Sequence, residues 1–254
     1  MRCSCRRALT AAAVLLFWGG VWVLAAGLVG RELLLPSPVQ VLRRLLELGG
    51  TGEFWRTVGC SILRVLTGIL SGSLLGILLA VVTERSALLK ALFSPVMTLV
   101  KSTPVASFII LALIWLGREI LPAVISALMV LPVVWTSVSA GIQGQDPQLL
   151  ELARVYGLPN GRIFLRITVP TVLPYLRSAL SSALGLGWKA GIAAEVLTVP
   201  QPSIGKMIFE SKLYLETTSL FAWTAAVVLI SLIIEKILLR LVRRSGRKGI
   251  LQDD

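Results

Sequence analysis

Few residues in this sequence could carry out chemistry on their own. The 254 residues include no histidine, which excludes histidine-based catalytic triads, HExxH zinc sites and imidazole acid–base chemistry. The three cysteines, Cys3, Cys5 and Cys60, are too few and too unevenly spaced for a disulfide framework or a zinc site. No segment has the GxxxxGKS/T pattern that holds nucleotide phosphates. We therefore predict no catalytic residue, no metal site and no cofactor bound by this chain.

Three ionisable residues, Lys101, Lys189 and Glu195, interrupt otherwise apolar segments. A lysine at the centre of a bilayer costs about 2.5–3.5 kcal/mol on insertion scales, so it normally faces a cavity or a partner. Lys101 stands just before Pro104, which breaks helical hydrogen bonding. Irregular backbone at membrane depth is tolerated only beside protein or water. These positions favour a path for an anionic substrate, lined by Lys101 and Lys189.

The alternative is a structural ion pair with Glu195, or a helix that begins only after Lys101. Lys189 and Glu195 would lie about 240° apart around one helix, so they are not expected to pair. Lys101 is then the expected partner of Glu195, which leaves Lys189 free to attract an anion. Arg64 and Arg177 are expected near the ends of spans, where long basic side chains can reach the membrane surface.

The composition indicates a membrane protein. Hydrophobic residues make up 56% of the chain and charged residues only 15%, with a mean hydropathy of +0.85. Soluble domains average about 45–50% apolar and about 25% charged residues. The net charge of +12 would suggest nucleic acid as a partner of a soluble protein, but here basic loops that orient the chain in a bilayer explain it, and we predict no nucleic-acid partner.

The apolar segments predict six membrane-spanning helices, because a span needs about 20 mostly apolar residues. The first follows basic residues as a signal peptide would, but its apolar stretch exceeds the 7–15 residues or so of a signal peptide, so we expect a retained helix. The predicted spans are residues 9–29, 58–82, 92–116, 121–142, 171–199 and 220–239, the third of them interrupted by charge and proline.

The distribution of basic residues predicts the orientation of these spans. With the N-terminus inside, the inner segments carry a large excess of Lys and Arg over Asp and Glu. The basic residues include Arg2, Arg6 and Arg7 near the N-terminus, and the few acidic residues include Asp253 and Asp254 near the C-terminus. The outer segments are nearly balanced. Because Lys and Arg accumulate on the cytoplasmic side of membrane proteins, both termini are predicted to be cytoplasmic.

Two further patterns concern packing. Ser37-Pro38 and Gly49-Gly50 bracket an amphipathic helix that either lies at the membrane surface or packs on neighbouring spans. Small residues recur at every fourth position in two spans and predict close helix packing within the chain. They are Gly68, Gly72, Gly76 and Ala80 in one span, and Ala179, Ala183, Gly187 and Gly191 in the other.

The longest inner loop, residues 143–170, is predicted to fold as a helix–turn–helix that projects into the cytoplasm. Asp146 and Pro147 have the chemistry of a helix start, and Gly157 provides a break after that helix. A second short helix is expected to follow and to end before Pro170. The loop is therefore too structured for a simple connector.

The loop resembles the EAA loop of ABC-transporter permeases. That motif reads Glu-Ala-Ala, three residues, Gly, nine residues, Ile-x-Leu-Pro, and this chain matches its spacing at Glu151, Ala153, Gly157, Ile167 and Pro170. The departures, Leu for Ala and Val for Leu, are both apolar. Over about residues 33–236 the chain is similar to the nitrate, sulfonate and taurine subfamily, through the segments Leu35–Pro38, Ser61-x-x-Arg64, Pro104–Ala106, Ile114–Gly117 and Ala193–Glu195.

The resemblance implies an all-α, six-span permease with the type I ABC importer fold, formed by residues 1–254 as one transmembrane domain. It also implies a bacterial cytoplasmic (inner) membrane location, surrounding lipids, and a second permease copy that completes a homodimer. The five motif residues would couple the chain to a dimer of ATP-binding subunits, which would hold ATP and Mg. A periplasmic or lipid-anchored binding protein would deliver a small anion such as a sulfonate, taurine or nitrate.

Two other classes of function remain open at this point. A secondary transporter driven by an ion gradient would predict an inverted repeat between the two halves, which is not apparent in the sequence. A membrane-embedded enzyme would need a histidine or clustered carboxylates on the inner face, and the sequence provides neither.

Overall fold

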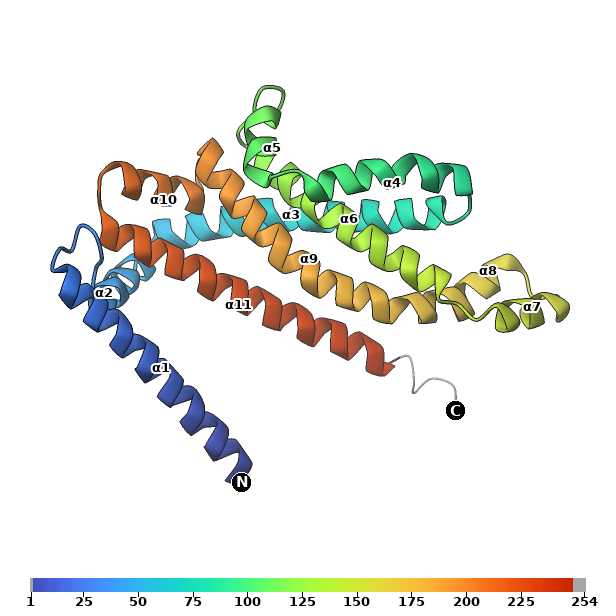
Figure 1. The fold of residues 1–254 in the computed structure, drawn as a ribbon, viewed down its shortest axis with the longest axis horizontal. Coiled ribbons are helices and arrows are strands. Elements are labelled where there is room, and N and C mark those ends of the chain that lie inside the picture. Colours follow the sequence, from blue (N-terminus) through green and yellow to red (C-terminus); the bar gives the residue numbers. More distant parts are fainter. Residues whose placement is uncertain (1, 249–254) are drawn as a thin grey trace.

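The computed structural model describes residues 2–248, and within that range every regular element is a helix (Figure 1). This confirms the predicted fold class. The N-terminal Met1 and the acidic pair Asp253 and Asp254 lie outside the described residues. In chain order the helices are α1 (Arg2–Val29), α2 (Pro38–Gly49), α3 (Gly52–Thr83), α4 (Ala87–Ser102), α5 (Val105–Ala112), α6 (Leu121–Gln143), α7 (Pro147–Val155), α8 (Asn160–Ile163), the π-helical turn η1 (Phe164–Thr168), α9 (Val169–Thr198), α10 (Ile204–Leu213) and α11 (Thr217–Lys248).

The core is built on α6, which packs along both α3 and α9. Close approach to α3 depends on glycine, because a Cβ atom at Gly68 or Gly72 would collide with the backbone of Ala123 or Ala127 on α6. On α9, a Cβ atom at Gly191 would lie only 2.7 Å from the Val65 side chain of α3. The two faces of small residues therefore join α3, α6 and α9, as the sequence predicted.

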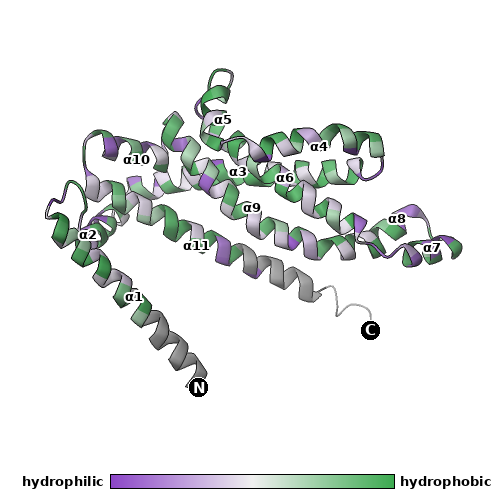
Figure 2. Ribbon diagram, viewed as in Figure 1, coloured by the Kyte–Doolittle hydropathy of each residue, from purple (hydrophilic) through white to green (hydrophobic). Residues whose placement is uncertain are grey.

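The structure places helices along the segments predicted to span the membrane, but it does not settle the number of spans. Three described helices, α3, α6 and the stretch Thr217–Ile237 of α11, are long and apolar enough to cross a membrane (Figure 2). The predicted third span is instead a pair of helices, α4 and α5, bent by 104° at the break before Val105. Helix α9 has 30 residues but carries Arg177, Lys189 and Glu195. The count of six spans and the cytoplasmic termini stay predictions.

Helix α2 begins with a complete capping box and packs on α11. The Ser37 hydroxyl accepts from the Gln40 backbone N–H, and the Gln40 side chain accepts from the Ser37 N–H at 2.8 Å. Val41 is buried, whereas Leu42 and Leu46 on the other side of the helix are exposed. Packing on a neighbouring helix, one of the two alternatives from the sequence, is therefore what the structure contains.

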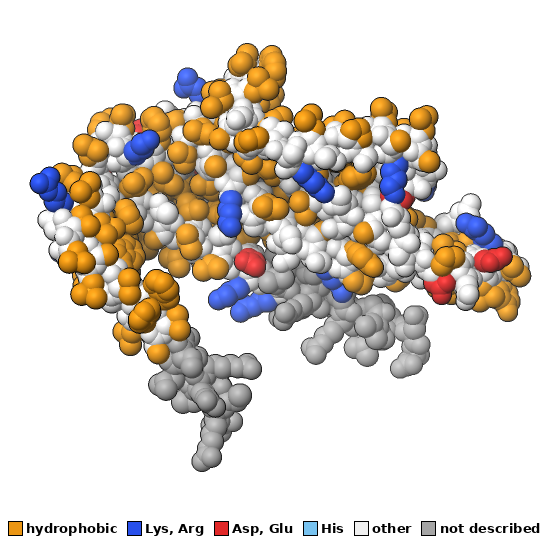
Figure 3. All heavy atoms as spheres, in the orientation of Figure 1, with side chains coloured by type: hydrophobic (Ala, Val, Ile, Leu, Met, Phe, Trp, Pro, Cys, Tyr) orange, Lys and Arg blue, Asp and Glu red, His pale blue; other side chains and the backbone are white. Residues whose placement is uncertain are grey.

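Hydrophobic side chains cover most of the molecular face seen in Figure 3. Acidic and basic side chains lie close together at the end where α7 and α8 project beyond the bundle, and further basic side chains are scattered over the rest of this face. A surface this rich in exposed apolar side chains fits a lipid environment rather than water.

Candidate functional site

The predicted cytoplasmic loop forms a projection made by α7, α8 and η1 at one end of the bundle (Figure 1). Its first helix starts where the sequence predicted. The Asp146 carboxylate accepts a hydrogen bond from the Gln148 N–H at 2.9 Å, and Pro147 occupies the first helical turn. The helix thus has a defined start that does not depend on contact with other helices.

Gly157 ends this helix in a left-handed conformation, with φ of +69°. The Leu158 N–H donates to the Ala153 carbonyl at 3.0 Å, and the Gly157 N–H donates to the Arg154 carbonyl at 2.9 Å. This pair of hydrogen bonds is a Schellman motif, in which glycine is preferred because a side chain at positive φ is strained. Two members of the five-residue motif, Ala153 and Gly157, thus belong to one turn, and Ala153 is buried.

The second half of the projection differs from the prediction. The short helix α8 ends at Ile163, before Pro170, but no loop separates it from the next span, because the helical backbone continues through η1 into α9. The Val169 N–H donates to the Phe164 carbonyl, which is the wider spacing of a π turn. Pro170 follows this π turn directly, and the turn already interrupts the regular hydrogen bonds of the α-helix, so a residue without an N–H is tolerated there. Ile167 is half-buried in the π turn.

The outer surface of α7 exposes apolar side chains, and a charged side chain lies next to them. Leu152, Val155 and Tyr156 are exposed by 52%, 79% and 77%. Glu151 is exposed next to them. A short, rigidly capped helix with exposed apolar side chains has the properties of a docking element for another protein.

A polar cluster joins the α3–α4 connection to the end of α6, next to the projection. Glu84 forms an ion pair with Lys90 at 2.9 Å and accepts from the Gln143 side chain at 2.9 Å. Burial raises the pKa of the Glu84 carboxyl, but the hydrogen bonds from Lys90 and Gln143 and the Lys90 charge outweigh it and hold this pKa below its ordinary value. Sequence reasoning used Glu84 and Lys90 only as loop charges.

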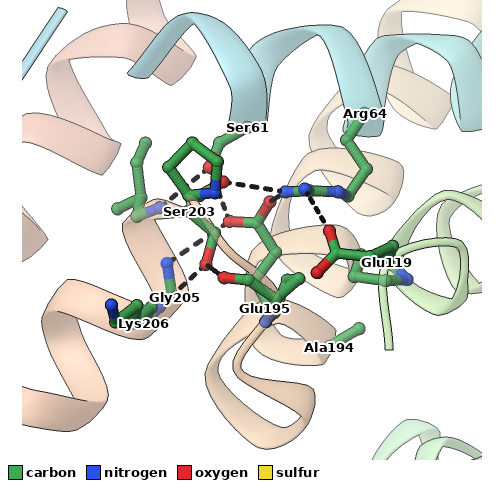
Figure 4. A network of polar contacts seen from close by, with 12 residues as sticks. Ser61, Arg64, Glu119, Ala194, Glu195, Ser203, Gly205 and Lys206 are labelled. Atoms are coloured by element: carbon green, nitrogen blue, oxygen red, sulfur yellow. Dashed lines mark hydrogen bonds and ion pairs between the residues drawn. The ribbon is translucent and has the colours of Figure 1, made fainter. Parts of the chain in front are cut away.

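Glu195 lies in a second polar cluster, between α3, α9 and α10 (Figure 4). Its side chain is fully buried. The Arg64 guanidinium donates to one carboxylate oxygen at 2.8 Å, and the Ser61 hydroxyl donates to the other at 2.7 Å. The Gly205 N–H is 3.3 Å from the oxygen that Ser61 contacts. The buried carboxylate thus has an ionic partner and two neutral donors, as a charge removed from water requires.

The expected pairing of Lys101 with Glu195 is wrong. Arg64 is the partner, and with 13% of its side chain exposed it turns into the protein instead of reaching for the membrane surface. Lys101 is exposed on α4, with its ammonium 3.4 Å from the Thr136 hydroxyl. The sequence contained a signal for this cluster, since Ser61 and Arg64 lie one helical turn apart, but that spacing entered only as part of a resemblance.

The same arginine reaches the loop between α9 and α10. A second guanidinium nitrogen of Arg64 pairs with Glu119 at 2.9 Å, and the other oxygen of Glu119 accepts from the Gln201 N–H at 3.0 Å. The Ser61 hydroxyl accepts from the Ile204 N–H at 2.8 Å. The cluster therefore fixes the α9–α10 loop and the start of α10 against α3 and the α5–α6 connection.

Lys189 lies outside both clusters. It is exposed on α9 within a continuous stripe of exposed positions that includes Ser178, Ser182, Leu186 and Ala193. Among the ion pairs found in the described residues, none involves Lys101 or Lys189. The described residues also contain no group of three His, Cys, Asp or Glu that could hold a metal ion.

Comparison with known proteins places these features in a family. The family model described as binding-protein-dependent transport system inner membrane component matches residues 72–248. The chain is 26% identical to the taurine transport system permease protein of Escherichia coli over 92% of this chain and 86% of that protein. It is 28% identical to the nitrate import permease protein of Leptolyngbya laminosa over 76% and 72%.

A putative aliphatic sulfonates transport permease protein of Bacillus subtilis is 26% identical, over 80% of this chain and 74% of that protein. Among solved structures, a chain of a bacterial alginate ABC transporter in complex with a periplasmic protein matches with a TM-score of 0.62 at 17% identity, over 96% of this chain and 95% of that one. A second structure of a bacterial alginate importer matches with a TM-score of 0.59. The fold is that of the type I ABC importer permeases.

The family match covers the last part of α3, all of α4 to α11 and the whole projection that carries the Glu151-to-Pro170 spacing. It leaves no support for a secondary transporter driven by an ion gradient or for a membrane-embedded enzyme. The chain belongs to the binding-protein-dependent transport system inner membrane component family and is a permease subunit of an ABC importer.

Proposed function

We propose that this permease forms the path of a small anion across the bacterial cytoplasmic membrane. The observation that carries the proposal is the exposed Lys189, on a helix that packs on its other side into the core. A charged side chain at membrane depth needs water, a partner or a ligand. Because no ion pair among the described residues involves Lys189, the anion itself is the partner that the proposal assigns to it.

The stripe around Lys189 gives the path its surface. Ser178, Ser182 and Ala193 are small, so they leave room along the stripe, and the two serine hydroxyls make it polar about two and three helical turns before the lysine. Lys101, beside the break between α4 and α5, is a second exposed cation. Glu195 is not part of this path in the proposal, because it is buried and paired with Arg64.

The names of the relatives support an anion as the substrate. These relatives are named for the transport of taurine, aliphatic sulfonates and nitrate, each of which carries a negatively charged oxyanion group. A lysine suits such a group, whereas a path for cations would need exposed carboxylates at this position.

The proposal also includes the other parts of the transporter, beginning with the partner of the projection. The exposed apolar side of α7 would dock on a separate ATP-binding subunit, and two such subunits would hold ATP and Mg. Two copies of this chain would enclose the path between them as a homodimer, with lipids around it. A periplasmic or lipid-anchored binding protein would deliver the anion to the face opposite the projection. Closure of the ATP-binding dimer would then move the two projections together and change which side of the path is open.

Uptake measurements with a charge-removing variant test the proposed path. Lys189→Met should raise the half-saturating substrate concentration at least tenfold or stop uptake, while the amount of protein in the membrane stays unchanged. Lys212→Met, at an exposed lysine on α10, is the matched control and should transport normally. Normal uptake of taurine, alkanesulfonates and nitrate alike by Lys189→Met, in cells where the parent takes up one of them, would overturn the proposal.

The assembly is tested by purification. The chain, purified in mild detergent from cells that express its genomic neighbours, should bring with it an ATP-binding protein in equal amount. Loss of that protein from the Glu151→Lys variant would locate the contact on α7, because this change reverses the charge beside the exposed apolar side chains. An intact complex with the variant would place the contact elsewhere.

A further inference from the structure

The α5–α6 connection is attached to the rest of the molecule in two different ways. Its apolar attachment is a small cluster of six buried residues, separate from the main core: Ile109 and Ala112 of α5, Leu121 and Ile125 of α6, and Ala190 and Ala194 of α9. Its polar attachment is Glu119, which contacts Arg64 and the Gln201 backbone. A segment with few buried apolar contacts opens at lower free energy than the core does.

The two carboxylates that Arg64 joins differ sharply in their surroundings. Glu195 is fully buried and has three donors, so separating it from Arg64 would leave a charge in the protein interior. Glu119 has 58% of its side chain exposed, so water can take the place of its protein partners. The first contact is therefore fixed, whereas the second can open and close at small cost.

We propose that Glu119 is a positioning residue that latches the outer end of the path shut. This inference rests on the proposed path along α9. Ala193 lies on the exposed stripe, and its neighbours Ala190 and Ala194 are the residues that pack with α5. Separation of α5 from α9 would widen the path at Ala193, and that separation requires Glu119 to release both Arg64 and Gln201.

The geometry of Glu119 explains how one residue can hold the α5–α6 connection to two other parts of the molecule. Glu119 uses its two oxygens on two different elements. One accepts from Arg64 of α3 (Figure 4), and the other accepts from the Gln201 backbone N–H in the α9–α10 loop. The buried cluster of Ser61, Arg64 and Glu195 holds the arginine in place, so the latch always closes on the same site. The buried pair acts as the fixed side of the latch, and Glu119 acts as its movable side.

Cysteine accessibility tests the latch without any substrate. The parent carries Ala193→Cys, with Cys3, Cys5 and Cys60 replaced by serine, and is assembled with its ATP-binding subunit in right-side-out membrane vesicles. The rate of labelling by a membrane-impermeant maleimide is the measurement. Glu119→Ala removes one exposed ion pair and one backbone hydrogen bond, so this rate should rise about three- to thirty-fold.

Two further variants define the interpretation. Glu119→Gln keeps an acceptor for the Gln201 N–H but not the charge, and should give an intermediate rate. Glu47→Ala is the matched control, because Glu47 is an equally exposed outer carboxylate, 52%, but pairs with arginines of its own helix, so its rate should equal the parent's. A parental rate for Glu119→Ala, or an equal rise with Glu47→Ala, would overturn the latch.

The labelling experiment needs no substrate, so its outcome can be told apart from the outcome of the uptake experiment with Lys189→Met. If Lys189→Met transports normally while Glu119→Ala raises the labelling rate, the latch stands and the assignment of Lys189 to the path fails. If Lys189→Met abolishes uptake while Glu119→Ala labels at the parental rate, the path stands and the latch fails.

Discussion

Removal of Arg64 should destabilise the permease strongly, and simultaneous neutralisation of Glu195 should restore most of the loss. Arg64→Met leaves a fully buried carboxylate with only the Ser61 hydroxyl and the Gly205 N–H as donors. Deleting one partner of a buried ion pair typically costs about 3–5 kcal/mol. Because these two donors remain, we expect the low end of that range, about 3 kcal/mol.

Glu195→Gln should cost less, about 1 kcal/mol, because the amide oxygen can still accept from Ser61 and Arg64 keeps Glu119 as an ionic partner. The double variant should lose about 1–2 kcal/mol, well below the sum of the single losses, since neither charge is then left alone. Arg43→Met is the control, because that arginine is exposed by 83% and pairs only within α2, so its change should lie below about 0.5 kcal/mol.

The assay is unfolding in mixed detergent micelles, followed by tryptophan fluorescence. Trp188, on α9 before Glu195, and Trp223, on α11, are buried and should report the loss of packing. The decisive quantity is the coupling energy from the double-mutant cycle, expected to be about 2 kcal/mol. Strictly additive losses would refute the reasoning, because they would mean that the buried carboxylate does not depend on Arg64.

Three further predictions concern the projection, its neighbouring cluster and the topology. Gly157→Val should abolish substrate-stimulated ATP hydrolysis without lowering membrane abundance, whereas Gly157→Asn, which tolerates positive φ, should retain part of it; normal hydrolysis by the valine variant would show that the turn is dispensable. Because the pKa of Glu84 is lower in the folded protein, its contribution to stability is complete above the ordinary value of 4.5 and is lost as the pH falls through the folded-state pKa. Glu84→Gln should therefore flatten the acid side of the stability profile, and an unchanged profile would contradict the ion pair. In a cysteine-free background, a cysteine at Gln201 should react with an impermeant thiol reagent in intact cells and one at Gly161 should not; the reverse pattern would invert the topology.

The features that could be predicted from the sequence are those that depend on neighbouring residues in the chain. The start of α7 at Asp146 and the turn at Gly157 follow from local hydrogen bonding and from the conformation that glycine allows. The glycine faces of α3 and α9 follow from the need for close packing. Each of these inferences needed only the residue type and the helical period.

The partner of Glu195 could not be predicted in this way. Periodicity indicates which residues share a face of a helix, but not which helix that face meets or how the two are rotated. Lys101 is the basic residue that the sequence leaves available for Glu195, whereas Arg64 is the arginine that the crossing of α3 and α9 turns inward. The continuation of α8 into α9 could not be predicted either, because a π turn before Pro170 lets the helix pass a residue without an N–H, and helical periodicity does not reveal such a turn.

The charges of this permease are of two kinds. Those of the first kind have an ionic partner within the chain, and those of the second kind have none among the described residues. Arg64 and Glu195 satisfy each other in the interior, and their neighbours satisfy what remains. Lys101 and Lys189 are exposed, and no ion pair of the described residues includes them. A charge of the first kind holds helices in place in every state of the protein, because leaving its partner would strand both charges. A charge of the second kind is satisfied only by something that comes and goes, which is what a transport path requires. For this reason Lys189, and not the more deeply buried Glu195, is the residue at which substitution should alter transport while the fold is preserved.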